Sequence, residues 1–381
     1  GAYKFSFLYP RIIYFFNKII NNNQIMVNDN TIELKNYRLF IFFQISIFFV
    51  SLVFLYKVIS KILEKRLSLI IISVLFLNPI IFQWHLAFLT ESLFLSVLIF
   101  SICFLLESKK FFHFFFLGIL IGVLYSLRTV ALLYPLILII YLLFQKKNIT
   151  HRIFNILSLV FGVAIIILFI GVQNYKRADV FYFTPIQSKT DLNTYIEAGI
   201  LVKSKNFTAL QAREYLNKKS QAILDNNNFD FTKESEKIRF FNEIRNNSIN
   251  TISENKIIFL QLILPNYFHS MLLNPVQVYF AAKYQTWEKY KNNPDHKFWL
   301  KIRVIITLLF FSLFLYGLII SRKKISLELN IFLFFSILYF FFTSCWLGNT
   351  RYFIPSIMFM SIYFSLALNK IYELITTKKL N

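Results

Sequence analysis

Long apolar runs dominate this sequence of 381 residues and leave it few ways to fold. Most of the runs are separated by short polar segments. A helix needs about 20 apolar residues to cross a bilayer, and only helices and closed barrels satisfy their backbone hydrogen bonds in lipid. We therefore predict an all-α polytopic membrane protein with about nine transmembrane helices, over residues 39–58, 67–83, 92–106, 113–127, 130–144, 152–171, 301–320, 328–345 and 353–369.

The composition supports a surface that faces lipid. Hydrophobic residues make up 57% of the chain and charged residues only 16%, which is too few to cover a soluble protein of this length. The net charge of +22 does not indicate nucleic acid, because the basic residues are not interleaved with aromatic ones on a soluble face. We expect membrane lipids, and no nucleic acid, among the partners.

Basic residues in the short segments predict the orientation. Fifteen of the 41 Lys and Arg residues form five groups that share one side of the membrane if the nine spans alternate. By the positive-inside rule that side is cytoplasmic. Tryptophan anchors helices at membrane boundaries, and all four Trp fall at the predicted outer boundary. The groups are Lys57–Arg66, Lys109–Lys110, Lys146–Arg152, Arg322–Lys324 and Lys370–Lys379, and the tryptophans are Trp84, Trp287, Trp299 and Trp346.

This topology divides the chain into four parts. Residues 1–38 form an outer interfacial segment, in which 7–20 are expected to lie on the bilayer as a helix. Transmembrane helices 1–6 occupy 39–172, an outer domain occupies 173–300, and helices 7–9 occupy 301–381.

Local patterns predict helices within the outer domain. Thr208 and Gln211 resemble a capping box that opens a helix ending near Leu224. A second helix carries an apolar stripe made by Ile238, Phe241, Ile249 and Ile252. Residues 257–281 are apolar enough to span, but Pro265, His269 and Pro275 favour an interfacial or re-entrant segment.

The run from Phe111 to Phe144 is too long for one span and contains Arg128. We interpret it as a hairpin of two short helices with Arg128 near the turn. A single long tilted helix that buries the arginine is the alternative.

Three charged residues fall at the outer ends of predicted spans, namely Glu91, Arg128 and Arg351. A charge at membrane depth costs at least about 2.5–3.5 kcal/mol, so it usually has a function or a partner. An arginine fork binds phosphate through two parallel hydrogen bonds, and a nearby carboxylate can act as a general base. His85 lies in the same outer turn as Glu91 and is a further candidate. An ion pair that only locks helices together is the alternative.

Some kinds of site are not indicated. His269 and His296 lack a second ligand at metal spacing, so we expect no metal. The sequence has neither a Gly-rich phosphate loop nor an Asp-x-Asp pair, which argues against a soluble activated nucleotide as direct donor. We expect no cofactor.

Several motifs, in order, resemble those of the integral-membrane GT-C glycosyltransferases, and most closely the bacterial relatives of polyprenyl- and dolichyl-phosphate-mannose-dependent mannosyltransferases. The resemblance covers most of residues 70–145 and 340–360. Its motifs are Asn78-Pro79, Leu89-Thr90-Glu91-Ser92-Leu93-Phe94, Gly118 to Leu127-Arg128, Asp191-Leu192-Asn193-Thr194-Tyr195, and Arg351-Tyr352-x-x-Pro355.

The resemblance implies an inverting transfer of sugar from a polyprenyl-phosphate carrier to a lipid, glycan or protein acceptor, at the outer face of a bacterial inner membrane. Glu91 is then a catalytic candidate, and Arg128, Arg351, Tyr352 and His85 are expected to bind substrate. The family's main acid follows its first span, so we expect that acid, with one further span, before Gly1. A non-catalytic protein or a transporter of lipid or polysaccharide export is the alternative.

Overall fold

The computed structural model describes residues 8–20, 27–28, 31–32, 37–87, 89–108, 110–145, 148–183, 192–273, 294–344 and 350–378. This part is helical apart from one short antiparallel pair of strands, β1 (Val27–Asn28) and β2 (Thr31–Ile32). The helices are α1 (Tyr9–Ile20), α2 (Tyr37–Ile59), α3 (Lys65–Leu77), α4 (Pro79–His85), α5 (Glu91–Glu107), α6 (Phe111–Leu127), η1 (Thr129–Ala131), α7 (Tyr134–Phe144), α8 (Ile149–Ala178), η2 (Leu192–Glu197), α10 (Ala198–Ser204), α11 (Ala209–Asn227), α12 (Glu234–Glu254), α13 (Lys256–Met271), α16 (Pro294–Lys324), α17 (Leu327–Ser344) and α18 (Thr350–Lys378).

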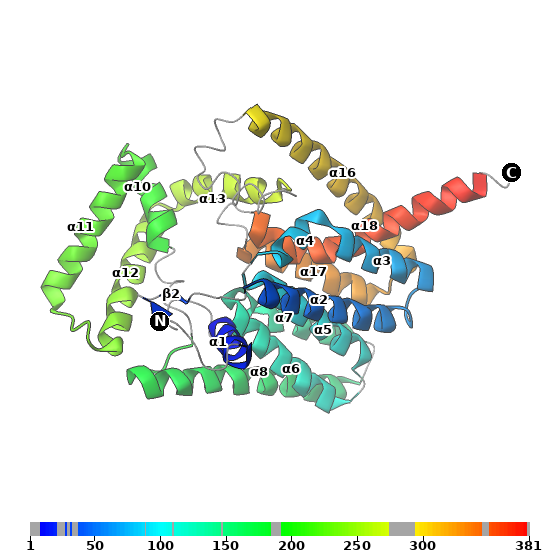
Figure 1. The fold of residues 1–381 in the computed structure, drawn as a ribbon, viewed down its shortest axis with the longest axis horizontal. Helices are drawn as coiled ribbons and strands as arrows, with labels where there is room; N and C mark the ends of the chain where they lie inside the picture. The colour runs from blue at the N-terminus through cyan, green and yellow to red at the C-terminus, as the bar shows by residue number, and fades with distance from the viewer. Residues whose placement is uncertain are drawn as a thin grey trace.

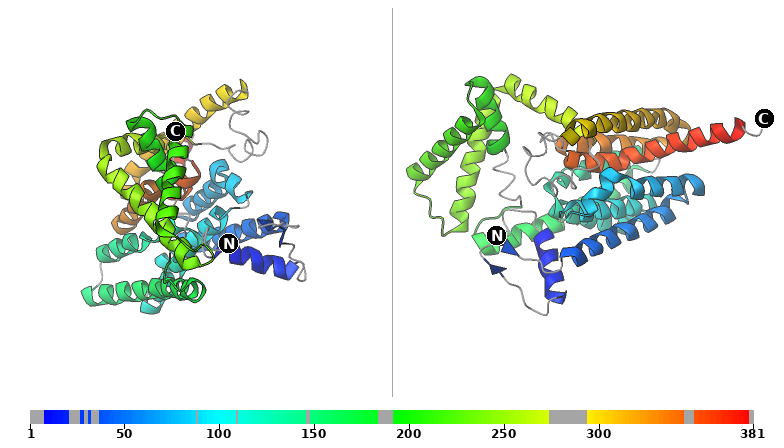
Figure 2. Two further views of the ribbon diagram at one scale, coloured as in Figure 1. Left: turned by 90° about the vertical axis from the view of Figure 1, so that its left-hand side faces the viewer. Right: turned by 45° about the horizontal axis from the view of Figure 1, so that its top comes forward.

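The helices form a bundle with a smaller group beside it. Figure 1 shows α2–α8 and α16–α18 packed together, while α10, α11 and α12 stand at the end away from the C-terminus. The second view in Figure 2 shows the same separation. The largest apolar core lies in the bundle, and three small clusters of buried residues occur in or near the outer group.

The structure confirms a helical membrane protein. Four described helices are long and apolar enough to cross a bilayer, over Arg38–Ile59, Ile149–Ala178, Phe298–Lys324 and Phe353–Thr376. A fifth is reached if α3 and α4, bent by 55° at Asn78, are one broken span. Every predicted apolar run is mostly helical, but the run 67–83 is divided between α3 and α4 and the remaining helices are shorter than 20 residues, so nine crossings stay a prediction.

Helix α5 runs between the two ends of the bundle. Its last residue, Glu107, pairs with Lys61 in the turn after α2. At the same end Lys324 lies 3.3 Å from Glu64 and 3.8 Å from Glu373. The described members of three basic groups therefore meet at one end, here called the basic end. Lys109, Lys146, Lys147 and Lys379 lie outside the described residues.

The predicted break at Arg128 is present. Arg128 is extended, with φ −148° and ψ 126°, and it separates α6 from η1 and α7. The alternative of one continuous helix is wrong.

α6 packs mainly along α8, where Gly118 and Gly162 face each other so closely that a Cβ on either would lie 2.2 Å from a carbonyl oxygen of the other helix. Small residues permit this kind of close crossing.

The predicted helix over 7–20 is α1, which packs one face on the bundle. Tyr9 and Ile13 are buried, and the Tyr9 and Phe16 rings contact Phe40 on α2. Tyr14, Phe15 and Ile19 are exposed on the remaining surface. One amphipathic helix with exposed apolar side chains suits a bilayer surface.

In the outer group, the capping box is confirmed: Thr208 and Gln211 bond reciprocally and open α11. The helix α12 is also present, but its predicted stripe is partly wrong. Ile238 is buried as predicted, but Ile249 is 40% exposed, while Phe240, Ile244 and Ser248 are buried. The Phe229 and Phe231 rings pack on Phe240, and Ser248 donates to Glu197.

The segment over 257–281 is α13 as far as Met271, with Pro265 inside the helix. It is not among the candidate spans. Residues 274–281, which include Pro275, lie outside the described residues.

Candidate functional site

Two of the three predicted charges meet at the end of α5 opposite the basic end. Glu91 is the first residue of α5, where the positive end of the helix dipole favours a carboxylate. Its Oε1 lies 3.4 Å from Arg128 Nη1. The Glu91 side chain is only 1% exposed and the Arg128 side chain 12%, so this ion pair is almost entirely removed from solvent.

Arg128 reaches Glu91 because the backbone breaks there. Its N–H bonds the Leu124 carbonyl 3.0 Å away and closes α6, and its carbonyl accepts the Ala131 N–H to open η1. Its guanidinium lies 5.5 Å from the centre of the buried Phe94 ring, one turn along α5 from Glu91. A cation over an aromatic face is attracted by the ring quadrupole. Arg128 is thus turned toward α5.

His85 belongs to the same region. It ends α4, is completely buried, and its Nδ1 lies 2.6 Å from the Ser92 hydroxyl, next to Glu91 in the chain. The Phe48 ring covers it at 3.9 Å between ring centroids. Among the described residues Nε2 has no hydrogen-bond partner. The His85 ring is therefore enclosed and does not face solvent, and it contacts the residue that follows Glu91 in the chain.

Two polar residues of this region were missed by the sequence reasoning. Gln44 is buried in the middle of α2, and its amide donates to the Leu89 carbonyl at 3.0 Å, which fixes the turn before Glu91. Ser92 accepts or donates at His85, depending on the tautomer. A lone amide within an apolar run was the available signal for Gln44, because such groups bond across helices.

Arg351 and Tyr352 lie in the first turn of α18, and their side chains lie outside the described residues. Helix α18 packs along α3 and also contacts α4, the helix that ends at His85. A contact of Arg351 or Tyr352 with Glu91 or Arg128 stays a prediction. Trp287 and Trp346 also lie outside the described residues. Trp84 is 6% exposed, so it is a packed residue and not an exposed boundary anchor.

The outer group holds a second buried carboxylate, Glu197, at the end of η2. Lys219 Nζ donates to it at 2.8 Å, Ser248 at 2.7 Å and Thr251 at 3.0 Å. Burial disfavours the ionised form, but these donors outweigh it and hold the pKa of Glu197 below its ordinary value. A carboxylate with this many donors ties η2, α11 and α12 together and is a poor proton acceptor.

Within the described ranges, no three His, Cys, Asp or Glu side chains cluster in a way that would hold a metal ion. In the Glu91–Arg128 region a carboxylate holds an arginine, and an arginine fork suits a phosphate or carboxylate ligand.

No family model, no curated protein and no solved structure matches this chain.

Proposed function

We propose that the protein is a membrane glycosyltransferase that moves a sugar from a polyprenyl-phosphate carrier to an acceptor hydroxyl with inversion. The observation that supports this most is the Glu91–Arg128 contact, which holds an arginine at the end of α5 opposite the basic end. A lipid phosphate remains at the boundary of the bilayer, so its partner must be a cation held at that depth. The order of the motifs around Glu91, Arg128 and Arg351 adds support.

In this proposal Arg128 binds the carrier phosphate. A guanidinium carries five N–H donors, so one that pairs with Glu91 can also take a phosphate oxygen. Arg351 and Tyr352, at the start of α18, complete the phosphate site, and His85 supports its base. Charge grows on the phosphate as the glycosidic bond breaks, and a fixed arginine stabilises that charge.

The transfer itself is a direct displacement. The acceptor oxygen bonds to the anomeric carbon on one face while the carbon–oxygen bond to the phosphate breaks on the other, and the bonding electrons leave with the phosphate. A carboxylate takes the acceptor proton. Because Glu91 is enclosed and paired, we assign it to hold Arg128, and the proton goes to a different carboxylate.

The proposal also fixes the orientation. The basic end faces the cytoplasm, the nine predicted helices all cross, and the Glu91–Arg128 end faces outward in the plasma membrane of a bacterium. The exposed apolar side of α1 and the helices α10–α13 lie on that outer side.

The test uses membranes that contain the full chain and a radiolabelled polyprenyl-phosphate hexose. After organic extraction of the carrier, label that stays in a new glycoside measures transfer. Hydrogen bonds to charged groups contribute about 1.5–3 kcal/mol, so Arg128→Gln should lower transfer about tenfold to hundredfold. Lys61→Gln, which breaks an ion pair at the basic end, is the matched control and should change transfer little.

The alternative is a non-catalytic protein or a carrier for lipid export, in which the pair only joins α5 to the break after α6. The burial of Glu91 favours this alternative. It predicts that label crosses the membrane, or stays in place, while all of it remains on the carrier. That result, or full transfer by folded Arg128→Gln, would reject the proposed function.

A further inference from the structure

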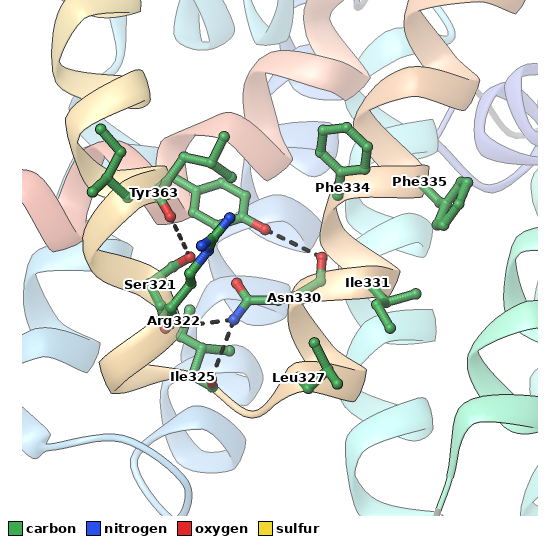
Figure 3. A pocket seen from close by; sticks show the side chains of 11 residues that line it. Ser321, Arg322, Ile325, Leu327, Asn330, Ile331, Phe334, Phe335 and Tyr363 are labelled. Atoms are coloured by element: carbon green, nitrogen blue, oxygen red, sulfur yellow. Dashed lines mark hydrogen bonds between the residues drawn. The ribbon is translucent and has the colours of Figure 1, made fainter.

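A groove of about 750 Å³ opens at the basic end, between α16, α17 and α18. Figure 3 shows its lining, which is apolar on the α17 side, with Ile331, Phe334 and Phe335. Arg322, Asn330 and Tyr363 supply the polar groups. The groove lies far from Glu91, at the opposite end of the bundle.

The packing of three helices creates this groove. Helices α16 and α17 both pack on α18 but touch each other little. Gly317 allows the close approach of α16 to α18, since a Cβ at that position would lie 1.8 Å from the Tyr363 carbonyl oxygen. Tyr363 forms the floor, and its hydroxyl donates to the Asn330 carbonyl at 3.3 Å. The space between α16 and α17 therefore results from the way both helices pack on α18.

One cation is directed at the groove. Arg322 lines it from the last turn of α16, and in the described part of the chain it has no carboxylate within ion-pair distance. Its neighbour Lys324 is instead engaged by Glu64 and Glu373. Lys323 is exposed and does not line the groove. Asn330 donates to the Ser321 and Ile325 carbonyls, which holds the mouth in shape.

We infer that this groove binds an anionic phospholipid, with one acyl chain against the apolar wall and the phosphate on Arg322. The edge of the groove faces lipid, because the Ile319 and Leu327 side chains that border it are each 71% exposed on helices of a membrane protein. An apolar channel that ends at an arginine matches a molecule with an apolar chain and an anionic head. The inference does not depend on the proposed transferase activity.

The experiment is native mass spectrometry of the full chain in detergent. The chain is titrated with phosphatidylglycerol and with diacylglycerol of identical acyl chains, which lacks the phosphate. Loss of one charged hydrogen-bond pair corresponds to about a tenfold change in affinity, so the anionic lipid should bind at a concentration about tenfold lower. Arg322→Gln should abolish this preference and Arg322→Lys should keep part of it, while Lys323→Gln, the matched control, should keep all of it.

A second variant tests the acyl chain. Ile331→Trp fills the groove and should weaken the binding of both lipids, while elution as a single species shows that the bundle is intact. Glycerol phosphate, which has the head but no chains, should not compete. Equal binding of the two lipids, an unchanged preference in Arg322→Gln, or competition by glycerol phosphate would each overturn the inference.

Discussion

The burial of the Glu91–Arg128 ion pair leads to a specific prediction about what it contributes to stability. The two charges are 3.4 Å apart, so their attraction is about 5 kcal/mol at an effective dielectric constant of about 20. Desolvation of both groups offsets most of that attraction, because the side chains are only 1% and 12% exposed. The pair as a whole therefore adds little net stability, whereas either charge alone is costly.

A double-mutant cycle separates these two quantities. Glu91→Met leaves a buried guanidinium without its carboxylate, and Arg128→Met leaves the reverse, so each should lower the free energy of unfolding by about 3–5 kcal/mol. The double variant replaces both charges with apolar groups and should lose less than either single variant. We expect a coupling energy of at least about 3 kcal/mol between the two positions.

The assay is unfolding of the full chain by sodium dodecyl sulfate in mixed micelles, followed by circular dichroism. The Lys61–Glu107 pair is the control, since its side chains are 67% and 49% exposed. Its coupling should stay below about 1 kcal/mol, as for other exposed pairs. If the losses at Glu91 and Arg128 simply add, or if their coupling equals that of the control, the pair does not act as a buried unit.

Three further predictions concern other parts of the molecule. Gly118→Leu should abolish the monodisperse folded species in size-exclusion chromatography, because even a Cβ would lie 2.2 Å from a carbonyl oxygen of α8. Gly199→Ala should leave that species unchanged, because its Cβ would meet only a flexible side chain at 3.1 Å. The pKa of Glu197 is held below its ordinary value of 4.5, so its stabilisation is present above that pH and lost as the pH falls through the folded value. Glu197→Gln should therefore speed amide exchange in α11 and α12 at pH 7 and reduce their acid sensitivity, and unchanged exchange would contradict this. Arg351→Lys should lower sugar transfer about tenfold if the arginine fork binds phosphate, and a normal rate would remove it from the site.

The sequence is sufficient to locate the helices. The apolar runs are mostly helical because their side chains favour burial or lipid, and the extended Arg128 interrupts one run at the predicted place, whereas the break at Asn78 within the run 67–83 was not predicted. The Thr208–Gln211 box also follows from local chemistry, since both of its bonds lie within four residues. Local patterns therefore predict local structure well.

Contacts between residues distant in the sequence were harder to predict. Glu91, Arg128 and Arg351 were expected at the same end of the bundle, and the ion-pair alternative did not say which arginine pairs with Glu91; the structure pairs it with Arg128. The spacing of Gly118 and Gly122 was a usable sign of a close helix crossing. The donors to Glu197 come from η2, α11 and α12, and nothing in their spacing identifies them as one cluster.

Helix α5 shows why hydropathy and length alone do not decide how a helix lies in this bundle. Its 17 residues extend about 25 Å, less than the roughly 30 Å of a hydrocarbon core. Neighbouring helices bury twelve of those residues. Ser96 and Ser101 donate to carbonyls one turn earlier, and the carboxylates at its two ends are paired with Arg128 and Lys61. Each polar group named here is thus paired within the protein. A helix enclosed in this way need not be as long or as uniformly apolar as a single helix surrounded by lipid. The pairing at its ends fixes α5 along the bundle axis, and this places Arg128 at one boundary of the bundle and the basic end at the other.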